Sequence, residues 1–134
     1  MSRTHIEVPA EIFRLANRRP AVLVVEDQII IASAIQDSLI ELGADVVGPC
    51  LTLESALDVA RSADIDAAVL DVWLKGEVCY PVADVLIERR IPFLFTSGVS
   101  AGKEPSKFHG SPRLLKPFSN QELHSALSAL WTRN

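Results

Sequence analysis

The stretch Ala21-Val22-Leu23-Val24-Val25 is a valine-rich apolar run, and the acidic pair Glu26-Asp27 follows it directly. A strand without polar alternation is typical of a parallel sheet that helices cover on both faces. The spacing then becomes helical, with Ile31, Ile35, Leu39 and Leu42 three or four positions apart and Gly43 as the expected helix end. The sequence therefore predicts a strand-helix unit that begins at residue 21.

The same alternation of short apolar runs and helix-periodic stretches continues to the end of the chain. It predicts further strands at 45–48, 67–70, 92–96 and 113–115. Helices are expected between them, one capped by Thr52 and the last opened by the capping-box pattern of residues 119–122. Residues 75–77 are expected in a loop, and 98–110 in a segment with a short or frayed helix. Five strands alternating with helices predict a doubly wound α/β fold with a parallel sheet.

We divide the chain into an N-terminal extension, residues 1–19, and one domain, residues 20–134. Pro9 and Pro20 bracket an amphipathic stretch, 10–17, for which we expect a short helix. Packing on the domain, dimerisation and fraying all remain open for this helix. The chain ends directly after the last expected helix, so we expect no output domain.

The composition narrows the class of protein. Charged residues make up 22% of the chain and the net charge is -4, a globular balance without the basic patch of a nucleic-acid surface. No segment resembles a signal peptide or has the roughly 18 apolar residues of a membrane span. Cys50 and Cys79 lack metal-ligand spacing and are expected to be buried free thiols. We expect a cytoplasmic protein that binds neither nucleic acid nor membrane.

Reactive side chains follow four of the expected strands. They are Glu26 and Asp27, Asp71, Thr96 or Ser97, and Lys116. Because the carboxyl ends of parallel strands meet at one edge, these groups should share one cleft. Three crowded carboxylates disfavour ionisation unless a cation neutralises them, and Mg²⁺ prefers such oxygen ligands. Each acid alone could serve only to cap a loop or a helix, but together they favour a functional site.

The chemistry of these residue types points to phosphoryl transfer. Asp71 can attack phosphorus as a nucleophile, and Mg²⁺ held by Asp27 and Asp71 would neutralise the transferring group. Lys116 can pair with a phosphoryl oxygen as a point charge. A hydroxyl at the end of the fourth strand can donate to another oxygen, and strand alternation allows only one of Thr96 and Ser97 to face the site.

The residues around these groups resemble the receiver domains of two-component signalling over roughly residues 20 to 132. The motifs are Val24-Val25-Glu26-Asp27, Ala68-Val69-Leu70-Asp71-Val72-Trp73-Leu74, the run from Pro92 to Gly98, and Leu114-Leu115-Lys116-Pro117-Phe118. The resemblance implies a flavodoxin-like receiver fold with strand order 2-1-3-4-5. It also implies Mg²⁺ bound by Asp27, Asp71 and the backbone carbonyl of Trp73, with Glu26 acting through water. The Lys116-Pro117 bond is implied to be cis.

Three positions stand out beside the family pattern. The family hydroxyl lies five residues after the proline of the fourth strand, which selects Ser97 over Thr96. The position of the usual switch aromatic holds Arg113. The run from Pro92 to Gly98 resembles a receiver subgroup with the signature P-F-x-F-A-T-G, whose members are often single-domain proteins without that aromatic, in agreement with Arg113. The bulky Trp73 at the mouth is hypothesised to slow hydrolysis of the acyl phosphate.

The resemblance implies a single-domain response regulator that takes a phosphoryl group from a histidine kinase or histidine phosphotransfer protein onto Asp71. It would promote its own phosphorylation and dephosphorylation without being an enzyme for another substrate. It would signal to a protein target by conformational change or act as a phosphate sink, as a monomer or homodimer. The alternative is a phosphorylation-independent interaction module on the same fold. An Asp-based phosphatase is disfavoured because Trp73 stands where such enzymes have a second acid.

Overall fold

A five-stranded parallel sheet forms the centre of the molecule. In the computed structural model, residues 19–98 and 104–130 are described. The strand order is β2-β1-β3-β6-β7. The strands are β1 (Ala21–Val25), β2 (Asp45–Cys50), β3 (Ala67–Asp71), β6 (Phe93–Ser97) and β7 (Arg113–Leu115). Counted along the sheet's own strands this order is 2-1-3-4-5, so the predicted doubly wound receiver fold is confirmed.

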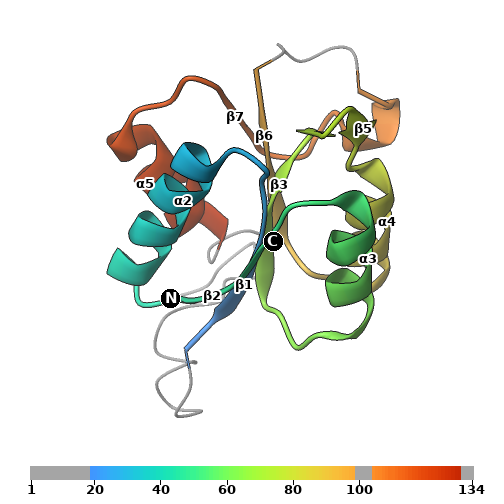
Figure 1. The fold of residues 1–134 in the computed structure, drawn as a ribbon, viewed down its shortest axis with the longest axis horizontal. Helices are drawn as coiled ribbons and strands as arrows, with labels where there is room; N and C mark the ends of the chain where they lie inside the picture. The colour runs from blue at the N-terminus through green and yellow to red at the C-terminus, as the bar shows by residue number, and fades with distance from the viewer. Residues whose placement is uncertain (1–18, 99–103, 131–134) are drawn as a thin grey trace, which may run out of the picture.

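Helices cover both faces of this sheet (Figure 1). They are α2 (Ile29–Glu41), α3 (Leu53–Ser62), α4 (Tyr80–Glu88) and α5 (Asn120–Leu130), with a short 3₁₀ helix, η1 (Ser106–Phe108). The helices α2 and α5 lie on one face of the sheet, and α3 and α4 lie on the other. This arrangement follows from right-handed crossovers between parallel strands.

The sheet separates two apolar cores because successive side chains point to opposite faces. Every residue of β3 and β6 is buried. Leu70 and Phe95 are neighbours in register and belong to the core beneath α3 and α4. Val69 and Leu94 are likewise neighbours and belong to the core beneath α2 and α5. The two central strands therefore hold their ends in fixed positions.

Two connections differ from the sequence-based expectation. The segment after β3 is not a plain loop but a two-stranded hairpin of β4 (Trp73–Leu74) and β5 (Glu77–Val78). Its turn residues, Lys75 and Gly76, have φ values of 51° and 82°, which suit a two-residue turn between antiparallel strands. The second strand also runs past its expected end at residue 48, through a register shift opposite Leu23 and Val25.

The terminal and loop predictions have mixed outcomes. The expected helix at 10–17 lies outside the described residues. The expected short helix within 98–110 is confirmed as η1, in the part that is described. Both Cys50 and Cys79 are buried and free, as expected. Among residues 19–98 and 104–130, no helix is long and apolar enough to cross a membrane.

Candidate functional site

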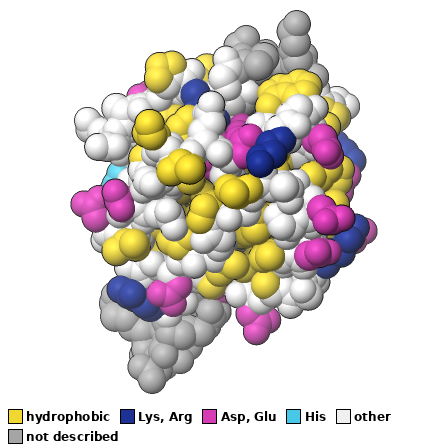
Figure 2. Space-filling model, viewed as in Figure 1, with side chains coloured by type: hydrophobic (Ala, Val, Ile, Leu, Met, Phe, Trp, Pro, Cys, Tyr) yellow, Lys and Arg dark blue, Asp and Glu magenta, His cyan; other side chains and the backbone are white. Residues whose placement is uncertain are grey.

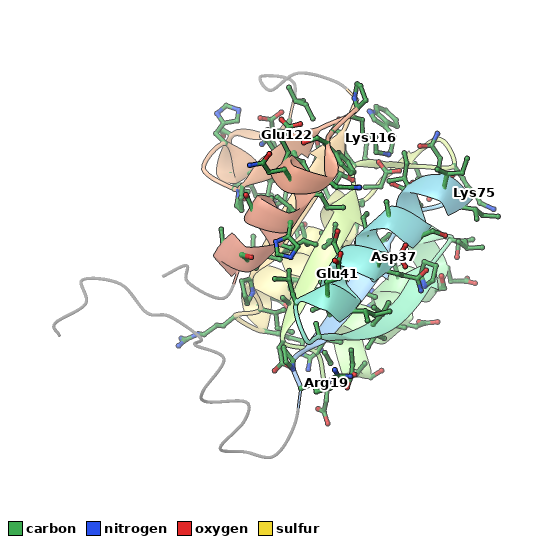
Figure 3. The ribbon with its side chains drawn as sticks, turned by 90° about the vertical axis from the view of Figure 1, so that its left-hand side faces the viewer. Arg19, Asp37, Glu41, Lys75, Lys116 and Glu122 are labelled. Atoms are coloured by element: carbon green, nitrogen blue, oxygen red, sulfur yellow. The ribbon has the colours of Figure 1, made fainter. Side chains whose placement is uncertain are left out.

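The carboxyl ends of the strands bring the predicted acidic residues together. Glu26 and Asp27 follow β1, and Asp71 is the last residue of β3. One carboxylate oxygen from each lies within 4.8 Å of the other two. Lys116 follows β7, and Figure 3 shows it at the opposite end of the molecule from Arg19, which precedes β1. The parallel sheet therefore brings the predicted acids together at one edge.

The Lys116 ammonium group joins this cluster as its cation. Its Nζ lies 2.9 Å from Glu26 Oε1 and 3.4 Å from Asp71 Oδ2. Glu26 is fully buried and Asp71 is 4% exposed, so both carboxylates have little water around them. Glu26 Oε1 pairs with Lys116 by charge but has no hydrogen-bond donor among the described residues. Because little water screens these charges, the Lys116 ammonium group attracts both carboxylates more strongly than it would in bulk water.

The electrostatics at Asp71 differ from those of an ordinary aspartate. Burial first, and then the charge of Glu26, raise the pKa of Asp71 to about 7, although Lys116 acts in the opposite direction. A hydrogen bond with Glu26 also favours the protonated form. A cation among these oxygens would favour the ionised form. The donor set, three carboxylates at one edge, fits a hard divalent ion such as Mg²⁺.

The two candidate hydroxyls lie at the end of β6 and point to opposite faces. Thr96 is opposite Asp71 in register, and its side chain is fully buried. Ser97 is 4% exposed and closes the strand, and its carbonyl oxygen accepts a hydrogen bond of 2.8 Å from the Lys116 backbone N–H. Both hydroxyl residues are therefore next to the acidic cluster, and the choice of Ser97 stays a prediction.

Trp73 and Gln28 lie next to the acidic cluster and form hydrogen bonds with it. The Trp73 backbone N–H donates to Asp71 Oδ1 at 3.3 Å, while its side chain is 51% exposed. The role of the Trp73 carbonyl as a metal ligand remains a prediction. The sequence reasoning missed Gln28, whose N–H donates to Glu26 Oε2 at 3.0 Å and whose Oε1 lies 3.5 Å from Lys116 Nζ. Its place directly after the acidic pair was the available signal.

The peptide bond before Pro117 is cis, as the resemblance implied. Arg113, at the position of the usual aromatic, forms an ion pair with Glu104 at 3.0 Å. Its guanidinium also donates to the Phe108 carbonyl oxygen at 3.2 Å and lies over the Phe95 ring. Arg113 therefore packs against β6 and η1 instead of projecting freely into solvent.

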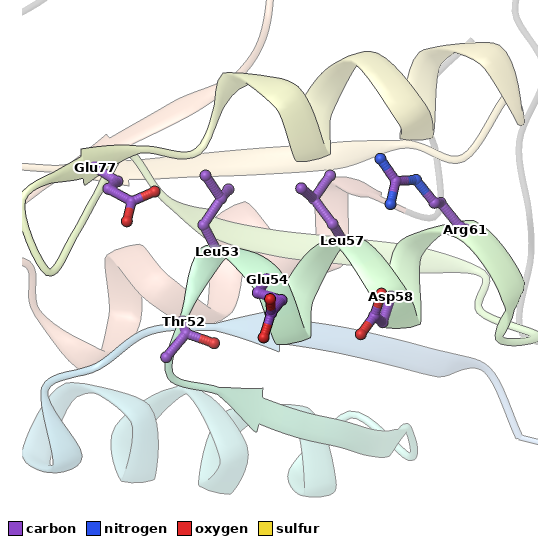
Figure 4. A pocket seen from close by; sticks show the side chains of 7 residues that line it. All are labelled: Thr52, Leu53, Glu54, Leu57, Asp58, Arg61 and Glu77. Atoms are coloured by element: carbon purple, nitrogen blue, oxygen red, sulfur yellow. The ribbon is translucent and has the colours of Figure 1, made fainter.

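A hollow lies along α3. Figure 4 shows the side chains that line it, Thr52, Leu53, Glu54, Leu57, Asp58, Arg61 and Glu77. Its charged residues are exposed, in contrast to the buried acids at the strand ends. On the face in Figure 2, acidic and basic side chains lie next to one another at the edges and in the upper middle, and hydrophobic side chains spread between them. The buried cluster at Asp71 is therefore the better candidate for chemistry.

Comparison with known structures places the chain in a family. The solution structure of SdrG from Sphingomonas melonis Fr1 has 41% sequence identity, covers 84% of this chain and 96% of SdrG, and has a TM-score of 0.73. The receiver domain of the Francisella response regulator 1452 has 25% identity, covers 84% of this chain and 97% of that domain, and has a TM-score of 0.70. This chain belongs to the response-regulator receiver family.

The receiver domain also shares its fold with more distant members. The HemR receiver domain from Leptospira biflexa has 22% identity and a TM-score of 0.76, and the match covers 87% of this chain and 97% of that one. No protein-family model matches the sequence, and no curated protein matches it. The assignment to the receiver family therefore rests on solved structures, and it agrees with the motifs at the strand ends.

Proposed function

We propose that this receiver domain accepts a phosphoryl group on Asp71 in a Mg²⁺-dependent reaction. The observation that supports this most is the position of Asp71 at the end of β3, beside two further carboxylates and 3.4 Å from Lys116 Nζ. An Asp71 carboxylate oxygen attacks phosphorus, and the bond from phosphorus to the donor breaks. The donor leaves with its electron pair, so one acyl phosphate forms for each donor consumed.

The neighbouring residues would divide the work. Asp27 and Asp71, the Trp73 carbonyl and, through water, Glu26 would hold Mg²⁺, which supplies positive charge against the phosphoryl oxygens when bound. Lys116 would pair with a phosphoryl oxygen, and Ser97 would donate a hydrogen bond to another. The hydrogen bond from the Lys116 backbone N–H to the Ser97 carbonyl oxygen supports these two roles because it holds the two residues side by side.

We propose a histidine kinase or histidine phosphotransfer protein as the donor. Two isoleucines at the start of α2, Ile29 and Ile30, are 77% and 85% exposed, and only Gln28 separates them from the acidic pair. Large exposed apolar side chains beside a reactive site support docking of a protein partner. The phosphorylated receiver would then bind a protein target or act as a phosphate sink, as a signalling protein and not as an enzyme.

We also propose that it acts as a single domain of residues 20–134 in the cytoplasm.

The test is the intact mass of the protein after incubation with acetyl phosphate and Mg²⁺. We expect the wild type to gain the mass of one phosphoryl group and Asp71→Asn to gain none. Persistence of the gain in Asp71→Asn would contradict Asp71 as the acceptor. If the wild type gains no mass with acetyl phosphate or with any phosphorylated histidine donor tried, the phosphorylation-independent interaction module becomes the better reading.

A further inference from the structure

Thr96 occupies an unusual place beside the phosphoacceptor. It is the residue of β6 opposite Asp71 in register, and it is fully buried. Val69 and Leu94 form the preceding pair on the same two strands, and both belong to the core beneath α2 and α5. Because side chains alternate along a strand, Thr96 and Asp71 share this face. The hydroxyl therefore lies in a row of apolar side chains next to the acidic cluster.

The Thr96 hydroxyl has no hydrogen-bond partner among the described residues. A buried polar atom without a partner lowers stability, and a native protein that keeps one needs an explanation. Valine has nearly the same shape and would fill this position without the unpaired oxygen. Packing alone thus gives no reason for a threonine at residue 96, whereas a second state in which the hydroxyl is paired would give one.

The partners of the Asp71 carboxylate indicate that second state. Oδ1 accepts from the Trp73 N–H, and Oδ2 lies 3.4 Å from Lys116 Nζ. In the proposed reaction Lys116 turns toward the phosphoryl group, so the Asp71 side chain loses a donor. Neighbouring strands are about 4.8 Å apart, and a threonine hydroxyl can rotate between staggered positions. The Thr96 hydroxyl is therefore within reach of the Asp71 side chain once Lys116 has turned toward the phosphoryl group.

We propose that Thr96 is a positioning residue whose hydroxyl donates a hydrogen bond to the Asp71 side chain when the phosphoryl group and Mg²⁺ are in place. This inference rests on the proposed phosphorylation of Asp71 and adds a residue to it. Ser97 keeps its role toward the phosphoryl group from the opposite side of the strand. The two adjacent hydroxyls then act on the two ends of the same acyl phosphate bond.

The test compares Thr96→Val, Thr96→Ser and the wild type in binding beryllofluoride with Mg²⁺, as a stand-in for the phosphoryl group. Binding is followed by Trp73 fluorescence in a Trp131→Phe background of the full chain. Loss of one hydrogen bond should weaken binding about three- to tenfold in Thr96→Val. Thr96→Ser keeps the hydroxyl and should bind like the wild type. Without ligand, Thr96→Val should melt no lower than the wild type, because it removes an unpaired polar atom.

Two results would overturn the role of Thr96. One is a Thr96→Val protein that binds beryllofluoride as tightly as the wild type. The other is an equal weakening in Thr96→Ser and Thr96→Val, which would trace the effect to packing. Ser38→Ala is the matched control because Ser38 is another buried hydroxyl, on α2, and its loss should leave the affinity unchanged. A wild type that fails to bind, like Asp71→Asn, would instead contradict the proposed function itself.

Discussion

The Lys116 ammonium group lies between two buried carboxylates, so its loss should lower stability most where Asp71 is ionised. We expect Lys116→Met to lower the free energy of unfolding by about 3 kcal/mol at pH 8 without divalent cations, because two buried acids lose their cation. The loss should be smaller at pH 5, since the pKa of Asp71 is about 7 and that acid is then mostly protonated. Urea unfolding at both pH values measures the difference.

Lys107→Met provides the control for this prediction. Lys107 also pairs with a carboxylate, Asp84 at 2.7 Å, but the two side chains are 58% and 48% exposed. Exposed ion pairs contribute about 0 to 1 kcal/mol, so this variant should lose little at either pH. A Lys116→Met loss as small as that of Lys107→Met, or equal at pH 5 and pH 8, would contradict the electrostatic account of the cluster.

The sequence predicted the positions of single residues better than their contacts. The position of Lys116 after a strand predicted its place beside Asp71, because parallel strands end at one edge. The partner of Arg113 could not be predicted, since Glu104 precedes it by nine residues in an irregular segment and no periodicity links them. That the Thr96 hydroxyl has no partner within residues 19–98 and 104–130 could not be predicted either, because alternation gives the face of a side chain but not its hydrogen-bond partners.

The last helix begins at a capping box that the sequence predicted and the structure contains. The Glu122 N–H donates to Ser119 Oγ at 3.1 Å, and the Ser119 N–H donates to Glu122 Oε1 at 2.9 Å. We expect Ser119→Ala to lower the free energy of unfolding by about 1 kcal/mol, because it leaves an N–H of the first turn unpaired. Thermal or urea unfolding measures this loss.

Ser119→Asp is the matched variant, since aspartate also caps a helix and should retain most of the stability. Ser119 lies outside the acidic cluster, so both variants should gain phosphoryl mass like the wild type. A stability loss in Ser119→Asp as large as in Ser119→Ala would contradict capping as the cause.

Elements with strong periodicity were predicted, and those set by local backbone geometry were not. The five strands of the main sheet follow from short apolar runs, and those of β1, β3 and β6 are buried along almost their whole length. The β4–β5 hairpin has only two residues in each strand, and its Lys75-Gly76 turn is a weak sequence signal. The extension of β2 likewise depends on Gly48, at φ +105°, where an added Cβ would lie 2.8 Å from the Val24 carbonyl oxygen.

At the scale of the whole molecule, the sheet concentrates negative charge at one edge and leaves the acids dependent on a cation. The candidate site was predictable because a doubly wound topology has one functional edge, and the sequence showed which residue ends each strand. The pKa of Asp71 was not predictable, since it depends on how deeply the folded chain buries that carboxyl beside Glu26.

We expect the affinity for Mg²⁺ to rise with pH. Below pH 7 most Asp71 side chains are protonated, because the pKa is about 7, and each must release its proton before it can bind the ion. From pH 6 to pH 8 the dissociation constant should therefore fall about tenfold and then level off. Titrations followed by Trp73 fluorescence, in Trp131→Phe and at constant ionic strength, measure it. Asp71→Asn has no proton to release and should bind more weakly, with little change across this range. If the wild type binds Mg²⁺ equally tightly at pH 6 and pH 8, the Asp71 carboxylate is already ionised before the metal binds, and the prediction is wrong.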